Sequence, residues 1–392
     1  MVPITYNVRS LLVRKISTIA SLVGIALVVV VSSCSSMLSN GIARTLKTSG
    51  RADTAIIMRM GSDAEMASGI DVSRISTVVS NPNFVAQDKS GNSLGVGEIV
   101  VVKTADRAGT TGGVSVSNVS IRGVPANVWD VRDDVKIVRG RKPQPGTDEV
   151  AIGKALPGRF QGVEFGANFE LKKNRVAQVV GVFDAGGSAF ESEIWADVDT
   201  VRQAFGRQGV VSSVRVRLLS PSKFEAFKTF VESDKTLGLM AQREDSYYEK
   251  QTEGMAGMVK AIGWVFAFLF SLGAMIGAAI TMYAQVANRS KEVGTLRALG
   301  FSRFAILLSF LVESVMMCFA GGVLGVLLAL PLGLVEFPMM NMATWAEVVF
   351  RFEPSAGTII GALVFATVMG IVGGFFPAWR ASKLSPVEAM RT

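Results

Sequence analysis

The chain has 392 residues, of which 49% are hydrophobic, and its mean hydropathy is +0.40. This composition is too apolar for an ordinary soluble protein of this length and predicts membrane-spanning helices. In a membrane protein, a net charge of +8 mostly reflects basic loops retained on the cytoplasmic side and contacts with lipid headgroups. No nucleic-acid-binding motif accompanies it. The absence of histidine, with only Cys34 and Cys318 as cysteines, argues against a histidine catalyst, a cysteine metal site and a disulfide framework.

The first 38 residues predict two helices. Residues 1–15 place Ile4, Val8 and Leu11 on one face, which indicates an amphipathic elbow helix in the cytoplasmic interface. Residues 16–38 carry no charge and are long enough to cross a hydrocarbon core of roughly 30 Å, so they predict the first transmembrane helix. Two alternatives are a cleaved signal peptide and a lipoprotein signal that ends at Cys34. A retained span is the preferred interpretation.

Residues 39–255 contain no second span and predict an extracytoplasmic α+β domain with two lobes. Short β-type runs such as 98–103 and 176–183 are separated by clusters of Gly, Pro, Asn and Asp, and 198–205 has a helical pattern. Neighbouring carboxylates such as Glu191 and Glu193 could do acid–base chemistry, but no His, nucleophile elbow or metal signature accompanies them. We therefore interpret them as solvated loop charges and predict that the chain is not an enzyme. Tyr247 and Tyr248 suit a membrane-interface helix.

Three further apolar stretches predict the remaining spans. Residues 256–287 form the end of a stalk and the second transmembrane helix, 304–335 the third and 356–376 the fourth, with a short outer loop at 336–355 and a cytoplasmic tail at 377–392. Each span contains a pair of glycines at GxxxG spacing, which allows close helix packing within one chain or across a dimer. These pairs are Gly273 and Gly277, Gly321 and Gly325, and Gly370 and Gly374.

Glu313 is the only acidic residue well inside an apolar stretch. Because an intramembrane carboxylate is costly, it is a functional candidate. It lies near the cytoplasmic end of its span, where it could snorkel to the surface or pair with an arginine of the preceding loop. We favour a structural or coupling role over substrate binding or proton relay.

The loop at 288–303 reads NRSKEVGTLRALGFSR and contains four basic residues and one acidic residue, which predicts a cytoplasmic position. Its apolar residues and glycines recur at helical spacing, so it predicts a short charged helix that docks into a soluble partner. The residues assigned to this docking helix are Asn288, Arg289, Lys291, Glu292, Val293, Gly294, Leu296, Arg297, Ala298 and Gly300.

The pattern N-R-x-K-E-V-G-x-L-R-A-L-G resembles the coupling-helix region of MacB/FtsX/LolC-LolE-like ABC transporter permease subunits. The phrases IRGV, DEVAIGKAL and IWADVDT resemble the extracytoplasmic part of the same group, and PAWRASKLSPVEAM resembles its C-terminal ending. The resemblance implies four transmembrane helices with a MacB-like periplasmic core domain between the first and second, in which residues 61–115 form a variable lobe.

The resemblance also implies a function. The chain would be the permease subunit of an ABC transporter in the bacterial inner membrane, with both termini cytoplasmic. The sequence has no GxxxxGK[ST] loop and starts at the elbow helix, so a separate ATPase subunit is expected to bind ATP and Mg. Other expected partners are a second permease copy or homologue, membrane lipids and a periplasmic protein or lipoprotein, but no nucleic acid. The expected process is mechanotransmission that exports a lipoprotein, a hydrophobic cargo or a periplasmic substrate. The alternative is an FtsX-like signal transmitter that activates a periplasmic partner such as a cell-wall hydrolase.

Overall fold

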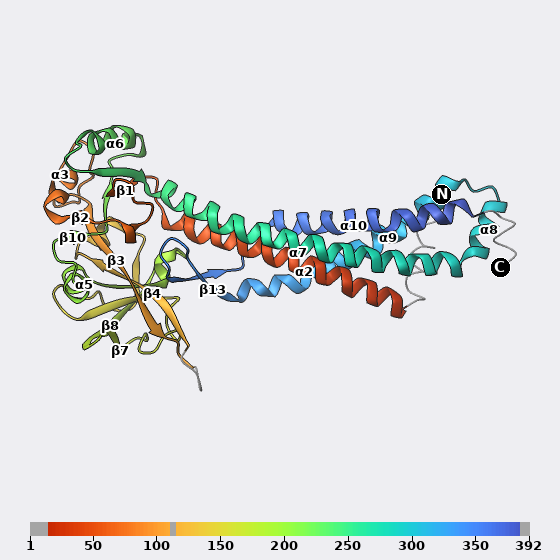
Figure 1. The fold of residues 1–392 in the computed structure, drawn as a ribbon, viewed down its shortest axis with the longest axis horizontal. Helices are drawn as coiled ribbons and strands as arrows, with labels where there is room; N and C mark the ends of the chain where they lie inside the picture. Colours follow the sequence, from red (N-terminus) through yellow and green to blue (C-terminus); the bar gives the residue numbers. More distant parts are fainter. Residues whose placement is uncertain (1–14, 110–114, 385–392) are drawn as a thin grey trace. The chain divides into compact units, whose positions relative to one another are not determined.

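The computed structural model describes residues 15–109 and 115–384, and these fall into two compact units (Figure 1). The helical unit comprises the described residues up to Gly41 together with Ala256–Val335 and those from Arg351 on. The core domain comprises Ile42–Met255 and Glu336–Phe350. The predicted elbow helix at 1–15 and the end of the predicted tail lie outside the described residues, apart from Lys15 and 377–384.

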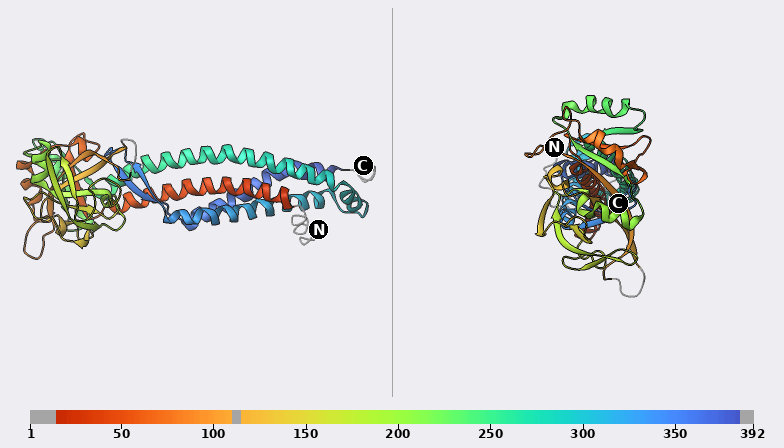
Figure 2. Two further views of the ribbon diagram at one scale, coloured as in Figure 1. Left: turned by 90° about the horizontal axis from the view of Figure 1, so that it is seen from below. Right: turned by 90° about the vertical axis from the view of Figure 1, so that its left-hand side faces the viewer.

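Long helices dominate the helical unit. Among the described residues, four helices have the length and apolar composition needed to cross a membrane. They are α2 (Lys15–Ser49), α7 (Glu244–Asn288), α9 (Arg303–Ala329, continued by the 3-10 turn Leu330–Leu334) and α10 (Ala356–Lys383). They run side by side in Figures 1 and 2, and the short helix α8 (Ser290–Ala298) lies between α7 and α9. The helices α2 and α7 extend without a break beyond the spans predicted at 16–38 and 256–287.

Two of the three glycine pairs bring helices of this unit into close contact. A Cβ atom on Gly325 of α9 would lie 2.7 Å from the Ala26 carbonyl oxygen of α2, and one on Gly370 of α10 would lie 3.0 Å from the Val315 Cα atom of α9. These glycines therefore allow backbones to approach more closely than a side chain permits. A Cβ atom on Gly273 or Gly277 of α7 would meet nothing within 4 Å among the described residues.

The core domain contains a ten-stranded mixed sheet in the order β12-β1-β11-β3-β4-β9-β6-β8-β5, with β7 paired to β8. The pairs β4–β9 and β6–β8 are parallel, and the other neighbours are antiparallel. The strands are β1 (Thr54–Arg59), β3 (Gly95–Asp106), β4 (Val116–Val124), β5 (Lys136–Gly140), β6 (Glu149–Gly153), β7 (Asn168–Lys172), β8 (Arg175–Asp184), β9 (Glu193–Asp197), β11 (Ser213–Arg217) and β12 (Leu239–Arg243).

Two apolar cores lie on this sheet. The first joins β1, β11 and β12 to the helices α3 (Ile75–Val79) and α6 (Phe224–Ser233), and the second joins β3, β4, β6, β8 and β9 to α5 (Val198–Phe205). Described residues among 61–115 contribute to both cores. Val78 belongs to the first core and Ile99 to the second, because each core is completed by strands distant in sequence.

The segment predicted as a short outer loop contains a β-hairpin. Its strands are β13 (Glu336–Met340) and β14 (Glu347–Arg351), and residues Glu336–Phe350 belong to the core domain. A second small sheet pairs β2 (Ile70–Asp71) with β10 (Val210–Val211). The tyrosine prediction was wrong: Tyr247 and Tyr248 are buried in the core domain, where Tyr248 packs edge-on against Phe190.

Candidate functional site

The helix α8 is a short knob with defined ends. Gly300 adopts a left-handed backbone with φ +93°, and its N–H donates to the Arg297 carbonyl oxygen, which closes the last turn. The Ser302 hydroxyl then accepts a hydrogen bond from the Ala305 N–H and caps α9. Four residues separate the two helices, and two of them, Gly300 and Ser302, end α8 and start α9.

The residues predicted to dock lie on two faces of this knob. Arg289, Val293 and Gly294 are buried within the helical unit, and Val293 packs with Met282 and Ile306. Leu296 and Arg297 are half-buried. The remaining predicted residues face solvent, namely Asn288, Lys291, Glu292, Ala298 and Gly300. Leu299, which the prediction omitted, is 73% exposed and adds an apolar side chain to this outward face.

The structure pairs Glu313 with an arginine of the predicted knob. The Arg289 guanidinium donates to the Glu313 carboxylate at 3.1 Å and to the Glu292 carboxylate at 3.0 Å, and it lies over the Phe310 ring. Glu313 is 2% exposed and so does not snorkel. Because a buried carboxylate needs a countercharge, this pair links the start of α8 firmly to the middle of α9.

A second group of buried charges lies in the core domain, on the face of the sheet opposite the apolar cores. In the register, Val100 faces Arg122 and Ser213 faces Glu98, so charged side chains of β3, β4 and β11 point to the same side. The seven charged residues of this cluster are at most 8% exposed. They are Glu65, Glu98, Arg122, Arg132, Glu193, Arg215 and Glu244. We call them the charge cluster.

Ion pairs connect the charge cluster throughout. Arg122 bonds Glu193 at 2.6 Å and Glu98 at 2.7 Å. Arg215 bonds Glu65 at 2.8 Å and Glu244 at 2.8 Å. Burial alone would raise the pKa of Glu65, but the charges of Arg122 and Arg215 outweigh burial and hold that pKa well below its usual range. Glu65 is therefore ionised at neutral pH, and its carboxylate pairs with both arginines.

Glu244 is the member of the cluster that holds a membrane-length helix. It is the first residue of α7, and its carboxylate accepts hydrogen bonds from Arg132, Arg215 and the backbone N–H of Arg51. Arg51 follows closely after the end of α2. One carboxylate therefore joins the end of α2 and the start of α7 to the central sheet.

Glu347 anchors the hairpin to the same domain. Its carboxylate accepts hydrogen bonds from Arg107, Arg159 and the Ser117 hydroxyl, the last at 2.7 Å. Glu347 is 5% exposed, and the nearby Val349 N–H donates to the Ser192 hydroxyl. The buried carboxylate of Glu347 thus attaches the chain between α9 and α10 to the core domain, in the same way as the carboxylate of Glu244 attaches the start of α7.

The interpretation of Glu191 and Glu193 as solvated charges was wrong. Glu193 belongs to the charge cluster, and the Glu191 carboxylate accepts hydrogen bonds from the backbone N–H groups of Ala185 and Gly187. Sequence reasoning also missed Arg122 and Arg215. The available signal was a charge inside a β-branched run, as in SIRGV and SVRVRL, because a strand places such a charge on a sheet face.

A bundle of membrane-length helices, a short charged helix between two of them and a mixed-sheet domain inserted after the first define a permease-like membrane protein. The MacB-like periplasmic core domain matches residues 16–233, and the FtsX-like permease C-terminal region matches residues 264–386. Since the first match covers more than half of the chain, the chain belongs to the MacB-like, FtsX-like permease family. The resemblance in the sequence is confirmed, as is an α+β domain after the first apolar helix.

The chain is similar to several proteins of known name. The chain is 31% identical over 233 residues to the macrolide export ATP-binding/permease protein MacB of Burkholderia lata, covering 56% of this chain and 32% of that protein. It is 28% identical over 330 residues to the probable syringafactin export ATP-binding/permease protein SyfD of Pseudomonas syringae, covering 77% and 46%. The chain thus spans less than half the length of either relative. The periplasmic region of MacB from Actinobacillus actinomycetemcomitans matches 53% of this chain and 96% of its own, at 12% identity and TM-score 0.39.

Proposed function

We propose that the chain is the permease subunit of an ABC transporter and couples ATP hydrolysis by a separate cytoplasmic ATPase to movements of its periplasmic domain. The chain crosses the bacterial inner membrane four times, with both termini in the cytoplasm. The observation that carries the proposal is the pairing of Arg289 with Glu313, which attaches an outward-facing charged helix rigidly to a membrane-length helix. Because α8 is attached rigidly, a displacement imposed on α8 by a partner would also move α9.

The outward face of α8 is the docking surface in this proposal. It combines the exposed charges of Lys291 and Glu292 with the exposed apolar side chain of Leu299. An exposed apolar side chain surrounded by charges is typical of a protein-binding surface. The names of the relatives combine an ATP-binding part with a permease, which supports an ABC ATPase as the occupant and as the holder of ATP and Mg.

Movement reaches the periplasmic domain through helices in this proposal. The helix α7 runs from Glu244 to Asn288 and ends directly before α8. In the core domain, Glu244 and Glu347 attach the start of α7 and the hairpin through buried ion pairs. Two arrangements of these helices, favoured by the ATP-bound and ATP-free partner, would form the two states of the transporter.

We infer the class of cargo from the names of the relatives. MacB and SyfD are named for macrolide export and syringafactin export. We assign this chain to export of a lipoprotein, a hydrophobic cargo or a periplasmic substrate. The match of residues 264–386 to the FtsX-like region keeps a second function open, in which the chain transmits a signal to a periplasmic partner such as a cell-wall hydrolase.

A second permease copy or homologue completes the proposed complex. A side chain at Gly273 or Gly277 of α7 would meet no described atom within 4 Å, and Leu269 and Ile280, which share this helix face, are exposed. An apolar helix face with paired glycines is suited to another transmembrane helix.

The test is co-purification of the tagged chain from its native membrane, followed by mass spectrometry and ATPase assays. We expect a stoichiometric ATPase that is lost when Lys291→Glu and Leu299→Asp alter the outward face of α8. Lys250→Glu, an exposed lysine of the core domain, is the matched control and should retain the ATPase. Retention of the ATPase by both α8 variants would refute docking at this face.

Vesicles with the assembled complex separate the two functions. ATP-dependent release of a lipidated cargo supports export. ATP turnover without release, together with activation of a periplasmic hydrolase, would support signalling instead.

A further inference from the structure

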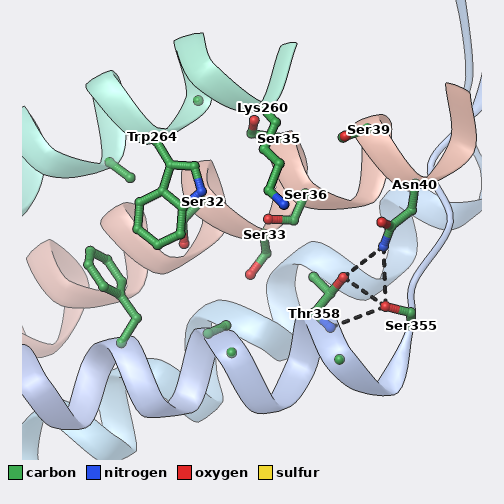
Figure 3. A pocket seen from close by; sticks show the side chains of 16 residues that line it. Ser32, Ser33, Ser35, Ser36, Ser39, Asn40, Lys260, Trp264, Ser355 and Thr358 are labelled. Atoms are coloured by element: carbon green, nitrogen blue, oxygen red, sulfur yellow. Dashed lines mark hydrogen bonds between the residues drawn. The ribbon is translucent and has the colours of Figure 1, made fainter. Parts of the chain in front are cut away.

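A cavity of about 360 Å³ lies inside the helical unit, among α2, α7 and α10 (Figure 3). Serines of α2 line it together with Lys260 and Trp264 of α7 and Phe365 of α10. The proposed coupling uses none of these side chains. A wall with this many polar side chains is unusual within a bundle of apolar helices. It indicates that the cavity binds a polar group.

Part of the polar wall serves helix packing. The Ser35 and Ser39 hydroxyls donate to the Val259 and Ala256 carbonyl oxygens of α7, each at 3.1 Å. The Asn40 amide donates to the hydroxyls of Ser355 and Thr358, the latter at 3.0 Å, as drawn in Figure 3. These bonds hold α2 against α7 and α10 and fix the shape of the cavity.

Two other hydroxyls of the wall have no such role. Ser33 is 3% exposed, and its hydroxyl has no hydrogen-bond partner among the described residues. Ser36 follows one helical turn later and lines the same cavity, and its hydroxyl forms no hydrogen bond with a described side chain or backbone group. Since buried polar groups are normally satisfied, the Ser33 hydroxyl indicates a missing partner inside the cavity.

The same end of the cavity is electropositive. Lys260 forms no ion pair with any described residue, and in Figure 3 its amine points toward Ser36. The helix α10 begins at Ala356, and Gly357 in its first turn lines the cavity. A helix start carries partial positive charge and N–H donors. A lysine, a helix start and two available hydroxyls together favour an anion with several oxygen acceptors.

The other end of the cavity is apolar. The Trp264 ring lies edge-on to the Phe365 ring at 5.9 Å between centroids, and Ala267 and Ala362 complete this part of the wall. Trp264 is 55% exposed on the outside of the bundle, so the apolar end reaches the lipid-facing surface. A small inorganic anion would gain nothing from such an end, whereas a lipid needs it for its chains.

We propose that this cavity binds the phosphate headgroup of an anionic membrane lipid, with Lys260, Ser33 and Ser36 around the phosphate and the acyl chains leaving past Trp264. The proposal rests on the proposed insertion of the chain in a membrane but not on its coupling to an ATPase.

The test measures lipid bound to the full chain alone, in nanodiscs with equal amounts of phosphatidylglycerol and phosphatidylcholine. After release from the nanodiscs, native mass spectrometry identifies the lipid that stays bound. We expect preferential retention of phosphatidylglycerol. Lys260→Gln should weaken its binding about tenfold and Ser33→Ala about threefold, whereas Lys260→Arg should retain the preference. Lys250→Gln, an exposed lysine earlier on α7, should change nothing.

Three outcomes would overturn the proposal. These are equal retention of both lipids, unchanged binding in Lys260→Gln, and protection against thermal unfolding by inorganic phosphate but not by phosphatidylglycerol. The last outcome would assign the site to a free anion. The assay contains no ATPase. A negative result would therefore refute the lipid site without refuting the proposed coupling.

Discussion

At the scale of single residues, the buried charges of the charge cluster and of α9 pair with countercharges that lie far away in the sequence. Glu65 meets Arg122 and Arg215, and Glu313 meets Arg289. Such pairs are weak sources of net stability, because desolvation cancels most of the attraction, but removal of one partner leaves a buried charge in an apolar surrounding. Their value lies in fixing which elements touch.

The charge cluster predicts how stability depends on pH. The pKa of Glu65 is lowered in the folded chain below the ordinary value of 4.5, so its ionised form stabilises the fold above that pH. This contribution is lost progressively as the pH falls below about 4.5. Denaturation of the full chain, followed by tryptophan fluorescence to which Trp195 beside Glu193 contributes, measures it. Glu65→Gln should flatten the dependence on pH, and an equally steep dependence in that variant would contradict the prediction.

The pair of Arg289 and Glu313 predicts a double-mutant pattern. Glu313→Leu alone removes the buried carboxylate that pairs with the Arg289 guanidinium and should destabilise the helical unit by about 3 kcal/mol. Adding Arg289→Met removes that charge and should restore most of the loss. Unfolding of each purified variant in mild detergent gives the coupling energy. Equal destabilisation by the single and double variants would mean that the ion pair does not explain the cost.

At the scale of elements, local sequence patterns determined some structure and tertiary pairing determined the rest. The helix pattern at 198–205 matches α5 in both bounds, since an Asp197 cap and a left-handed Gly206 define its ends. The hairpin at Glu336–Arg351 escaped prediction because its strands are short and Glu347 is buried only by groups of the core domain that are distant in sequence. The alternation of charged and apolar residues along the strands of the charge cluster is visible in the sequence. The residues that pair with these charges are not, because they lie far away in the sequence.

The glycine pairs predict two different phenotypes. Gly325→Leu should destabilise the chain by about 2 kcal/mol, because its side chain would overlap the backbone of α2. Gly277→Leu should leave the stability of the isolated chain within about 0.5 kcal/mol, since its side chain meets open space. In the membrane, however, it should weaken association with a second copy. Thermal unfolding and cross-linking measure the two effects, and a destabilised Gly277→Leu chain would contradict this assignment.

At the scale of the whole molecule, hydropathy in the sequence indicated the order of the membrane-length helices and the inserted domain. It did not indicate how the segments are attached, because attachment depends on single buried carboxylates such as Glu244 and Glu347. Each lies at a point where the chain passes between a membrane-length helix and the core domain. Attachment points of this kind are what a mechanical coupling requires, and they carry no local sequence signature.

The attachment at Glu347 predicts a loss of coupling when it is removed. Glu347→Ala removes the acceptor of Arg107, Arg159 and Ser117 and frees the hairpin from the core domain, while α8 and its outward face stay unchanged. Under the proposed coupling, ATP turnover by the complex should persist, whereas ATP-driven cargo release should fall at least tenfold, because even one of the lost charge-assisted contacts corresponds to about 1.5 kcal/mol.

Release and turnover are measured on the same vesicles, so the ratio of the two reports coupling alone. Glu164→Ala, which removes an exposed carboxylate of the same domain, is the matched control and should leave that ratio unchanged. If Glu347→Ala lowered turnover and release in equal proportion, the hairpin would act on assembly and not on transmission. An unchanged ratio would therefore leave Glu244 as the attachment through which α7 moves the domain, because its carboxylate joins both α2 and α7 to the central sheet.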